Sequence, residues 1–78
     1  MRRRISRRKR RYILGKGAEI LHEGWITEPG WDGKAYEVRL KYLGWTIYAA
    51  DRDELGAYNA AIACFPSCEE EPFVKENV

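Results

Sequence analysis

The sequence opens with MRRRISRRKRR, in which eight cations fall within ten consecutive residues. Guanidinium groups pair bidentately with phosphate oxygens, and a dense group of them neutralises a polyanion. From Tyr12 onward the chain carries six cations and all twelve acids, so the first segment has a charge of +8 and the rest has −6. This asymmetry is typical of a nucleic-acid contact. The expected phosphate-binding residues are Arg2, Arg3, Arg4, Arg7, Arg8, Lys9, Arg10 and Arg11.

A second set of candidate binding residues lies in the middle of the chain. The segment AYEVRLKY alternates apolar and polar residues, which predicts a strand buried on one side with Arg39 and Lys41 on the other. In the next segment, WTIYAA, Tyr48 lies on the face opposite to Trp45 and Ile47. Cationic side chains can read base edges, and tyrosine can stack on a base. The alternative is an ordinary solvated strand face.

Residue types that support catalysis or metal binding are scarce. His22 is the only histidine, and no sequence motif places it beside Ser6 or Ser67 as a nucleophile. Cys64 and Cys68, even with His22, lack the fourth ligand of a zinc site. The acidic DRDE segment is explained by helix capping. We therefore expect no enzymatic activity, no cofactor and no metal.

The two cysteines bear on cellular location. They are too few for a disulfide framework, which favours reduced thiols in a cytoplasmic or nuclear compartment, although whether they pair stays open. No apolar run has transmembrane length, so a soluble protein without a membrane partner is expected.

The chain divides into three parts. Residues 1–11 show no apolar pattern, and mutual repulsion favours a disordered basic arm. Residues 12–68 have the composition of one small α+β domain. Residues 69–78 begin with EEEP, which predicts an acidic flexible tail.

Three antiparallel strands are expected within the domain. A tight break at Leu43-Gly44 joins the two alternating segments into a hairpin. The turn-rich EPGWDG suggests another hairpin, whose first strand would span roughly residues 20–27. That segment fits neither the strand nor the helix period cleanly, and residues 18–23 would also suit a helical turn. The expected core face of the middle strand comprises Tyr36, Val38, Leu40 and Tyr42.

One helix is expected after the strands, in DRDELGAYNAAIACF. Asp51 would cap its first turn and Glu54 would complete a capping box, while Pro66 would stop the helix. Its apolar stripe comprises Leu55, Tyr58, Ile62 and Phe65. The predicted fold is thus an α+β arrangement in which one C-terminal helix packs on a three-stranded antiparallel sheet.

This order of elements, together with several short motifs, resembles known DNA-binding domains. The motifs are Gly33-Lys34, Val38-Arg39, Trp45 and the segment AYNAA. Over roughly residues 33–61 they resemble the three-stranded DNA-binding domains of plant ethylene-response factors and the amino-terminal domains of tyrosine recombinases. The resemblance implies that the exposed sheet face enters the major groove, with Arg39, Lys41, Tyr48 and Thr46 contacting DNA.

Two functional hypotheses follow from the sequence. The first is a small nucleic-acid-binding protein, DNA being preferred over RNA through the resemblance, with an accessory or regulatory role of the kind found in phages and mobile elements. The second is a protein-interaction module or inhibitor that docks its acidic body on a basic nucleic-acid-binding partner. Oligomeric state is not determined by the sequence.

Overall fold

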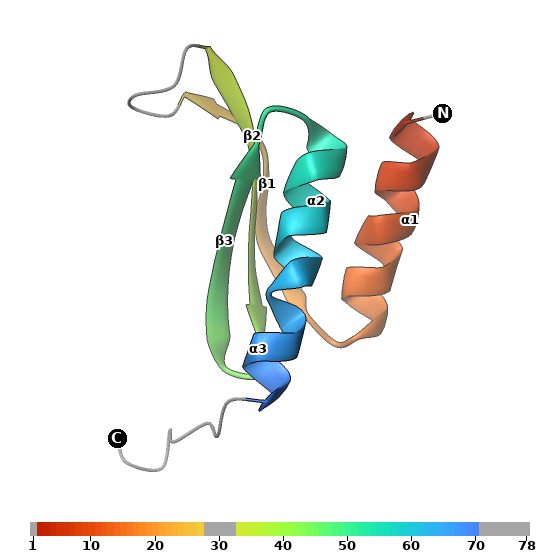
Figure 1. The fold of residues 1–78 in the computed structure, drawn as a ribbon, viewed down its shortest axis with the longest axis vertical. Helices are drawn as coiled ribbons and strands as arrows, with labels where there is room; N and C mark the ends of the chain where they lie inside the picture. The colour runs from red at the N-terminus through yellow and green to blue at the C-terminus, as the bar shows by residue number, and fades with distance from the viewer. Residues whose placement is uncertain (1, 28–32, 71–78) are drawn as a thin grey trace.

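A computed structural model describes residues 2–27 and 33–70 of the chain. Three helices lie on one side of a three-stranded sheet, and α1 runs beside α2 (Figure 1). This is an α+β fold, as the sequence predicts. The elements in chain order are α1 (Arg2–Gly15), β1 (Glu19–Thr27), β2 (Lys34–Tyr42), β3 (Trp45–Asp51), α2 (Glu54–Ala63) and α3 (Phe65–Glu70).

The sheet is antiparallel with the order β1-β2-β3, which confirms the three predicted strands. The register between β1 and β2 shifts between Ile20 and His22, where Leu21 forms a bulge. A bulge shifts the alternation of side chains along a strand by one residue. Ile20 and Glu23, although three residues apart, therefore both lie on the core face of the sheet, opposite Leu40 and Val38. This shift explains why the sequence of β1 fits neither period.

The tight turn between β2 and β3 is also confirmed. Leu43 and Gly44 have φ values of 53° and 84°, so both central residues of the two-residue loop are left-handed. Such a turn matches the twist of an antiparallel hairpin. The other predicted turn, EPGWDG, falls mostly on residues 28–32, which lie outside the described residues.

The hydrophobic core lies between the sheet and the helices. The predicted core face of β2 is buried, and β3 adds Ile47 and Ala49. Helix α2 contributes small residues that allow it to approach the sheet closely, while α1 contributes Ile13. The largest fully buried side chains are Tyr58, Phe65, Ile13, Leu40 and Val38.

The prediction of a disordered basic arm is wrong, because residues 2–15 form α1. Ser6 and Ile13, seven residues and two turns apart, are 3% and 0% exposed. Among the side chains described in α1, residues 5–15, only these two are buried, so a sequence pattern dominated by arginine concealed the helix. The first cations of the chain are therefore held on a packed helix.

Helix α1 ends in a Schellman motif at the GKG segment. Gly17 has a φ of 93°, its amide donates to the carbonyl of Leu14, and the amide of Ala18 donates to the carbonyl of Ile13. Glycine adopts this conformation without the penalty that a side chain imposes. The buried Ala18 then packs near Ile13 and leads the chain into β1.

The single predicted C-terminal helix is two helices in the structure. Helix α2 ends at Ala63, and Pro66 lies in the first turn of α3, where its missing amide hydrogen costs no helical hydrogen bond. Pro66 thus begins a new helix instead of ending the chain's helical structure. Glu69 and Glu70, predicted to begin a flexible tail, form the end of α3, and residues 71–78 lie outside the described residues.

The predicted helix cap and apolar stripe are displaced. Asp51 is still in β3, paired with Tyr36, so Asp53 caps α2 and accepts a hydrogen bond from the amide of Gly56 at 2.7 Å. Leu55 and Ile62 are only half-buried. The buried positions of α2 and the start of α3 are Ala57, Tyr58, Ala61 and Phe65.

Replacement of Leu43 should stabilise the hairpin. A left-handed conformation costs an ordinary residue roughly 1–2 kcal/mol, and asparagine tolerates it better. Leu43 is 52% exposed, so its loss removes little packing. Leu43→Asn is expected to raise the free energy of unfolding by about 0.5–1 kcal/mol in urea titrations. A loss of stability would show that Leu43 contributes by packing and that the turn conformation is unstrained.

Candidate nucleic-acid interface

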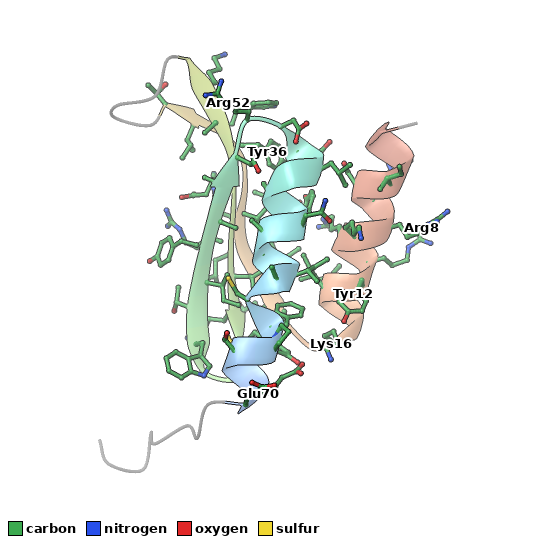
Figure 2. The ribbon with its side chains drawn as sticks, in the orientation of Figure 1. Arg8, Tyr12, Lys16, Tyr36, Arg52 and Glu70 are labelled. Atoms are coloured by element: carbon green, nitrogen blue, oxygen red, sulfur yellow. The ribbon has the colours of Figure 1, made fainter. Side chains whose placement is uncertain are left out.

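The outward side of α1 carries a continuous group of arginines. We call Arg7, Arg8 and Arg11 the outer basic face; they are exposed, and Arg7 and Arg11 are one helical turn apart. Figure 2 shows Arg8 projecting away from α2. Among the residues that the structure describes, none of the three forms an ion pair, and the half-buried Lys9 forms none either. These cations are free to meet an external anion.

A hollow of about 430 Å³ lies along the same helix. It is lined by Arg7, Arg10, Arg11 and Leu14, so its described lining contains three guanidinium groups and no acid. Planar guanidinium groups suit bidentate recognition of phosphate oxygens. The hollow therefore offers a place where one phosphate group meets more than one arginine.

Arg10 differs from the other cations because it anchors α1 to the sheet. Its Nε donates to Glu23 of β1, at 2.8 Å from Oε1 and 3.0 Å from Oε2. This hydrogen bond is the main cause that raises the pKa of Arg10 above its ordinary value. Glu23 also accepts a hydrogen bond from the hydroxyl of Tyr58 in α2. One carboxylate thus joins α1, β1 and α2.

The aromatic residues around Glu23 complete this junction. Tyr58 is 1% exposed, and its ring centroid lies 5.9 Å from that of Tyr36, which forms a T-shaped pair with Trp25 at a centroid distance of 5.3 Å. Burial is the main cause that raises the pKa of Tyr58, and the hydrogen bond to Glu23 adds to it. Burial likewise raises the pKa of Tyr36. Both phenols therefore keep their protons at physiological pH, and the hydroxyl of Tyr58 donates to Glu23.

A second junction lies just after the C-terminal end of α1. Lys16 Nζ lies 2.9 Å from Glu69 Oε2, and the hydroxyl of Tyr42 donates to the same oxygen at 2.5 Å. The hydrogen bond from Tyr42, followed by that from Lys16, lowers the pKa of Glu69. Phe65 stacks between Tyr42 and Tyr12, with centroid distances of 4.2 and 6.3 Å. The C-terminal half of α1 is thus tied to the rest of the fold at two points.

The predicted sheet-face residues lie together on β2 and β3. Arg39 and Tyr48 are cross-strand partners, and the guanidinium carbon lies 5.0 Å from the ring centroid. Lys41 is exposed and pairs in register with Thr46. These positions alternate with the buried core residues of the same strands, so they lie on the face away from the helices.

Glu37 reduces the positive charge of this sheet face. Its Oε1 lies 3.3 Å from Arg39 Nη2 and 2.9 Å from His22 Nδ1. Arg39 Nε is buried and has no hydrogen-bond partner among the described residues. The sheet face therefore holds Arg39 partly neutralised and oriented by the protein itself, unlike the outer basic face of α1.

The two predicted groups of binding residues form separate surfaces. Helix α1 lies on the same side of the sheet as α2 (Figure 1). Arg39, Lys41 and Tyr48 alternate with the buried core residues of their strands and so lie on the opposite side. Arg2, Arg3 and Arg4 belong to the first turn of α1, and their side chains lie outside the described part of the chain. Sequence reasoning missed Glu23, because its importance depends on three elements that meet only in the folded chain.

Comparisons with protein-family models, curated proteins and solved structures find no match to this chain. Within residues 2–27 and 33–70, no cluster of three or more histidine, cysteine, aspartate or glutamate residues is arranged to hold a metal ion. In the same ranges, no helix has the length and apolar character needed to cross a membrane. The functional argument therefore depends on the surfaces of α1 and the sheet.

The Tyr58–Glu23 contact makes stability sensitive to high pH. The pKa of Tyr58 is raised above 10.0 in the folded chain, so unfolded Tyr58 loses its proton first as pH rises. The contribution of Tyr58 to the free energy of unfolding is therefore complete below pH 10 and declines as pH rises above it. Tyr58→Phe should lower the free energy of unfolding by about 1–2 kcal/mol near neutral pH and flatten the decline in alkali, as measured by urea titration across pH.

Tyr48→Phe is the matched control, because Tyr48 is 65% exposed. It should leave the free energy of unfolding at neutral pH within about 0.5 kcal/mol of the original. If Tyr58→Phe and the original chain lost stability in parallel across the alkaline range, the role given to Tyr58 would be wrong.

Proposed function

We propose that this chain is a small non-enzymatic nucleic-acid-binding protein that contacts the phosphate backbone through the outer basic face of α1. The observation that carries the proposal is the exposure of Arg7, Arg8 and Arg11 on a packed helix without ion pairs to described residues. Phosphate neutralisation with counterion release supplies most of the affinity in such contacts. A packed helix holds these cations in fixed relative positions and so reduces the entropy lost on binding.

The charge on α1 itself supports this proposal. Like charges one turn apart destabilise a helix, and cations near its N-terminus oppose the helix dipole. Helix α1 has no acid in its first turn and carries Arg7 and Arg11 at such spacing. The electrostatic cost within the folded chain would be relieved by phosphate groups. Binding should therefore stabilise α1.

DNA is the preferred nucleic acid. Phosphate contacts carry no sequence information and do not by themselves separate DNA from RNA. The resemblance to three-stranded DNA-binding domains supports the preference for DNA. Arg39, Lys41 and Tyr48 on the sheet face form a second, weaker contact surface in this proposal. The small size of the chain suits an accessory or regulatory role.

The alternative, an inhibitor that uses its acidic body, receives less support. Glu23, Glu37 and Glu69 are engaged by cations of the same chain. Carboxylates that are already paired have less free charge to imitate the phosphates of a nucleic acid. The uncompensated surface charge of α1 favours the first hypothesis.

Mobility-shift titrations at several salt concentrations test the proposal. With about four phosphate contacts, the logarithm of affinity should fall against the logarithm of salt with a slope of about −3.6. Arg7→Gln combined with Arg11→Gln should weaken duplex DNA binding and reduce the steepness by about 1.8, because two contacts are lost. Point variants are preferable to deletion of residues 1–11, since deletion would remove buried Ser6 and the anchor Arg10.

The matched control removes two cations from the sheet face, with Arg39→Gln and Lys41→Gln. These two substitutions remove the same amount of positive charge as Arg7→Gln with Arg11→Gln, but they should reduce the affinity for DNA less. A larger effect of the sheet-face pair would place the main interface on the sheet. Absence of binding by the original chain to DNA and RNA at low salt would contradict the proposed function.

A further inference from the structure

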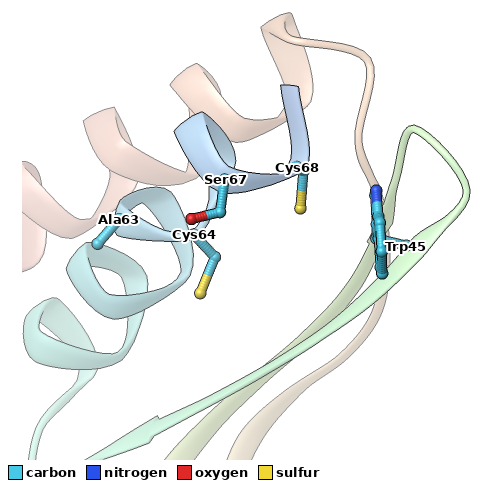
Figure 3. Close-up of a pocket in the computed structure, with 5 residues that line it drawn as sticks. All are labelled: Trp45, Ala63, Cys64, Ser67 and Cys68. Atoms are coloured by element: carbon cyan, nitrogen blue, oxygen red, sulfur yellow. The ribbon is translucent and has the colours of Figure 1, made fainter. Parts of the chain in front are cut away.

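We propose that Cys64 and Cys68 form a site for one soft monovalent metal ion of the copper(I) class. The two cysteines and Trp45 line a hollow of about 260 Å³ between β3 and the junction of α2 and α3, with Ala63 and Ser67 completing its lining. Figure 3 shows both sulfur atoms on the side of the helices that faces Trp45. This inference is independent of the nucleic-acid proposal.

The spacing of the cysteines suits a bridging ion better than a disulfide. The amide of Cys68 donates to the carbonyl of Cys64 at 3.2 Å, so the two residues are one α-helical turn apart. Residues at this spacing have Cβ atoms about 5–6 Å apart, whereas a disulfide needs about 3.5–4.5 Å. A direct bond would distort the turn. An ion placed between the two sulfur atoms requires no such approach.

The local structure restricts movement of the thiols. Both cysteines are half-buried and pack against the hydrophobic core. Cys64 Sγ also donates a hydrogen bond to the carbonyl of Ala60 at 3.5 Å. Pro66, between them in the first turn of α3, fixes its own φ angle. These constraints reduce the rearrangement needed when an ion binds.

The chemistry of the lining selects the class of ion. Thiolates are soft ligands that favour copper(I), and two of them satisfy an ion that accepts linear coordination. A structural zinc ion needs four ligands, whereas the described lining supplies only two cysteines with no histidine or carboxylate. On binding, each thiol releases one proton to solvent, so the product of a monovalent ion and two thiolates carries one negative charge.

Copper(I) titration of the reduced, full-length chain tests the site. Under anaerobic conditions, copper(I) would be supplied from a coloured chelator that competes for it. One ion should bind per monomeric chain, as read by chelator absorbance and native mass spectrometry. Tryptophan fluorescence should decrease in the same titration. X-ray absorption of the loaded chain should show two sulfur ligands on copper.

Variants separate the site from adventitious thiol binding. Loss of outer partners of metal sites already lowers affinity ten- to hundredfold, so Cys64→Ser and Cys68→Ser should each weaken binding by more than about 100-fold. Ser67→Ala, in the same hollow, should retain the original affinity. Far-UV circular dichroism would confirm that each variant is folded.

Several outcomes would overturn this inference. One is affinity that stays unchanged in either cysteine variant. Another is one ion shared by two chains, which would mean that the cysteines bind between molecules. A third is ready formation of an internal disulfide without loss of helix signal, because the turn would then allow direct bonding.

Discussion

The docking of α1 depends on a carboxylate shared by three elements. Glu23 of β1 accepts hydrogen bonds from Arg10 of α1 and from Tyr58 of α2. The half-buried position of Glu23 strengthens its hydrogen bond from the buried Tyr58, whereas the Arg10 side chain is 46% exposed and its ion pair is partly screened by solvent. Buried Ile13 supplies the accompanying apolar contact. Because this junction uses Arg10 internally, it determines which cations of α1 remain available outside.

Because α1 is docked in this way, its basic residues have two different roles. Arg10 and Lys16 hold α1 to the fold through Glu23 and Glu69, whereas Arg7, Arg8 and Arg11 face solvent. A flexible arm would lose much conformational entropy on reaching a phosphate backbone. A docked helix has lost that entropy during folding. The entropy needed to order these cations is therefore lost when the chain folds and is not lost again when a nucleic acid binds.

Much of the sheet could be predicted because its signals are local. The alternation along β2 identifies its buried face, and Leu43-Gly44 marks the turn. The first strand was harder to recognise because the bulge at Leu21 shifts its alternation. The cap of α2 was misplaced by two residues because cross-strand pairing keeps Asp51 in the sheet, and no local pattern reports such pairing.

The helix α1 could not be recognised from local signals. Over residues 5–15, where side chains are described, its buried positions are Ser6 and Ile13, and one of these is polar, so no apolar stripe is visible among the arginines. The basic residues are evident in the sequence, but their arrangement depends on Glu23, thirteen residues beyond Arg10. The two surfaces that the sequence suggested for one ligand lie on opposite sides of the sheet, which depends on how the chain packs.

Amide hydrogen exchange of the full-length chain is the most direct test of α1 docking. If Glu23 holds α1 against the fold, the amides of residues 10–14 should exchange more than about 100-fold slower than in an unstructured peptide. Glu23→Gln should remove most of that protection while the amides of β2 stay protected. Exchange of the α1 amides at the rate of an unstructured peptide in the original chain would contradict the account.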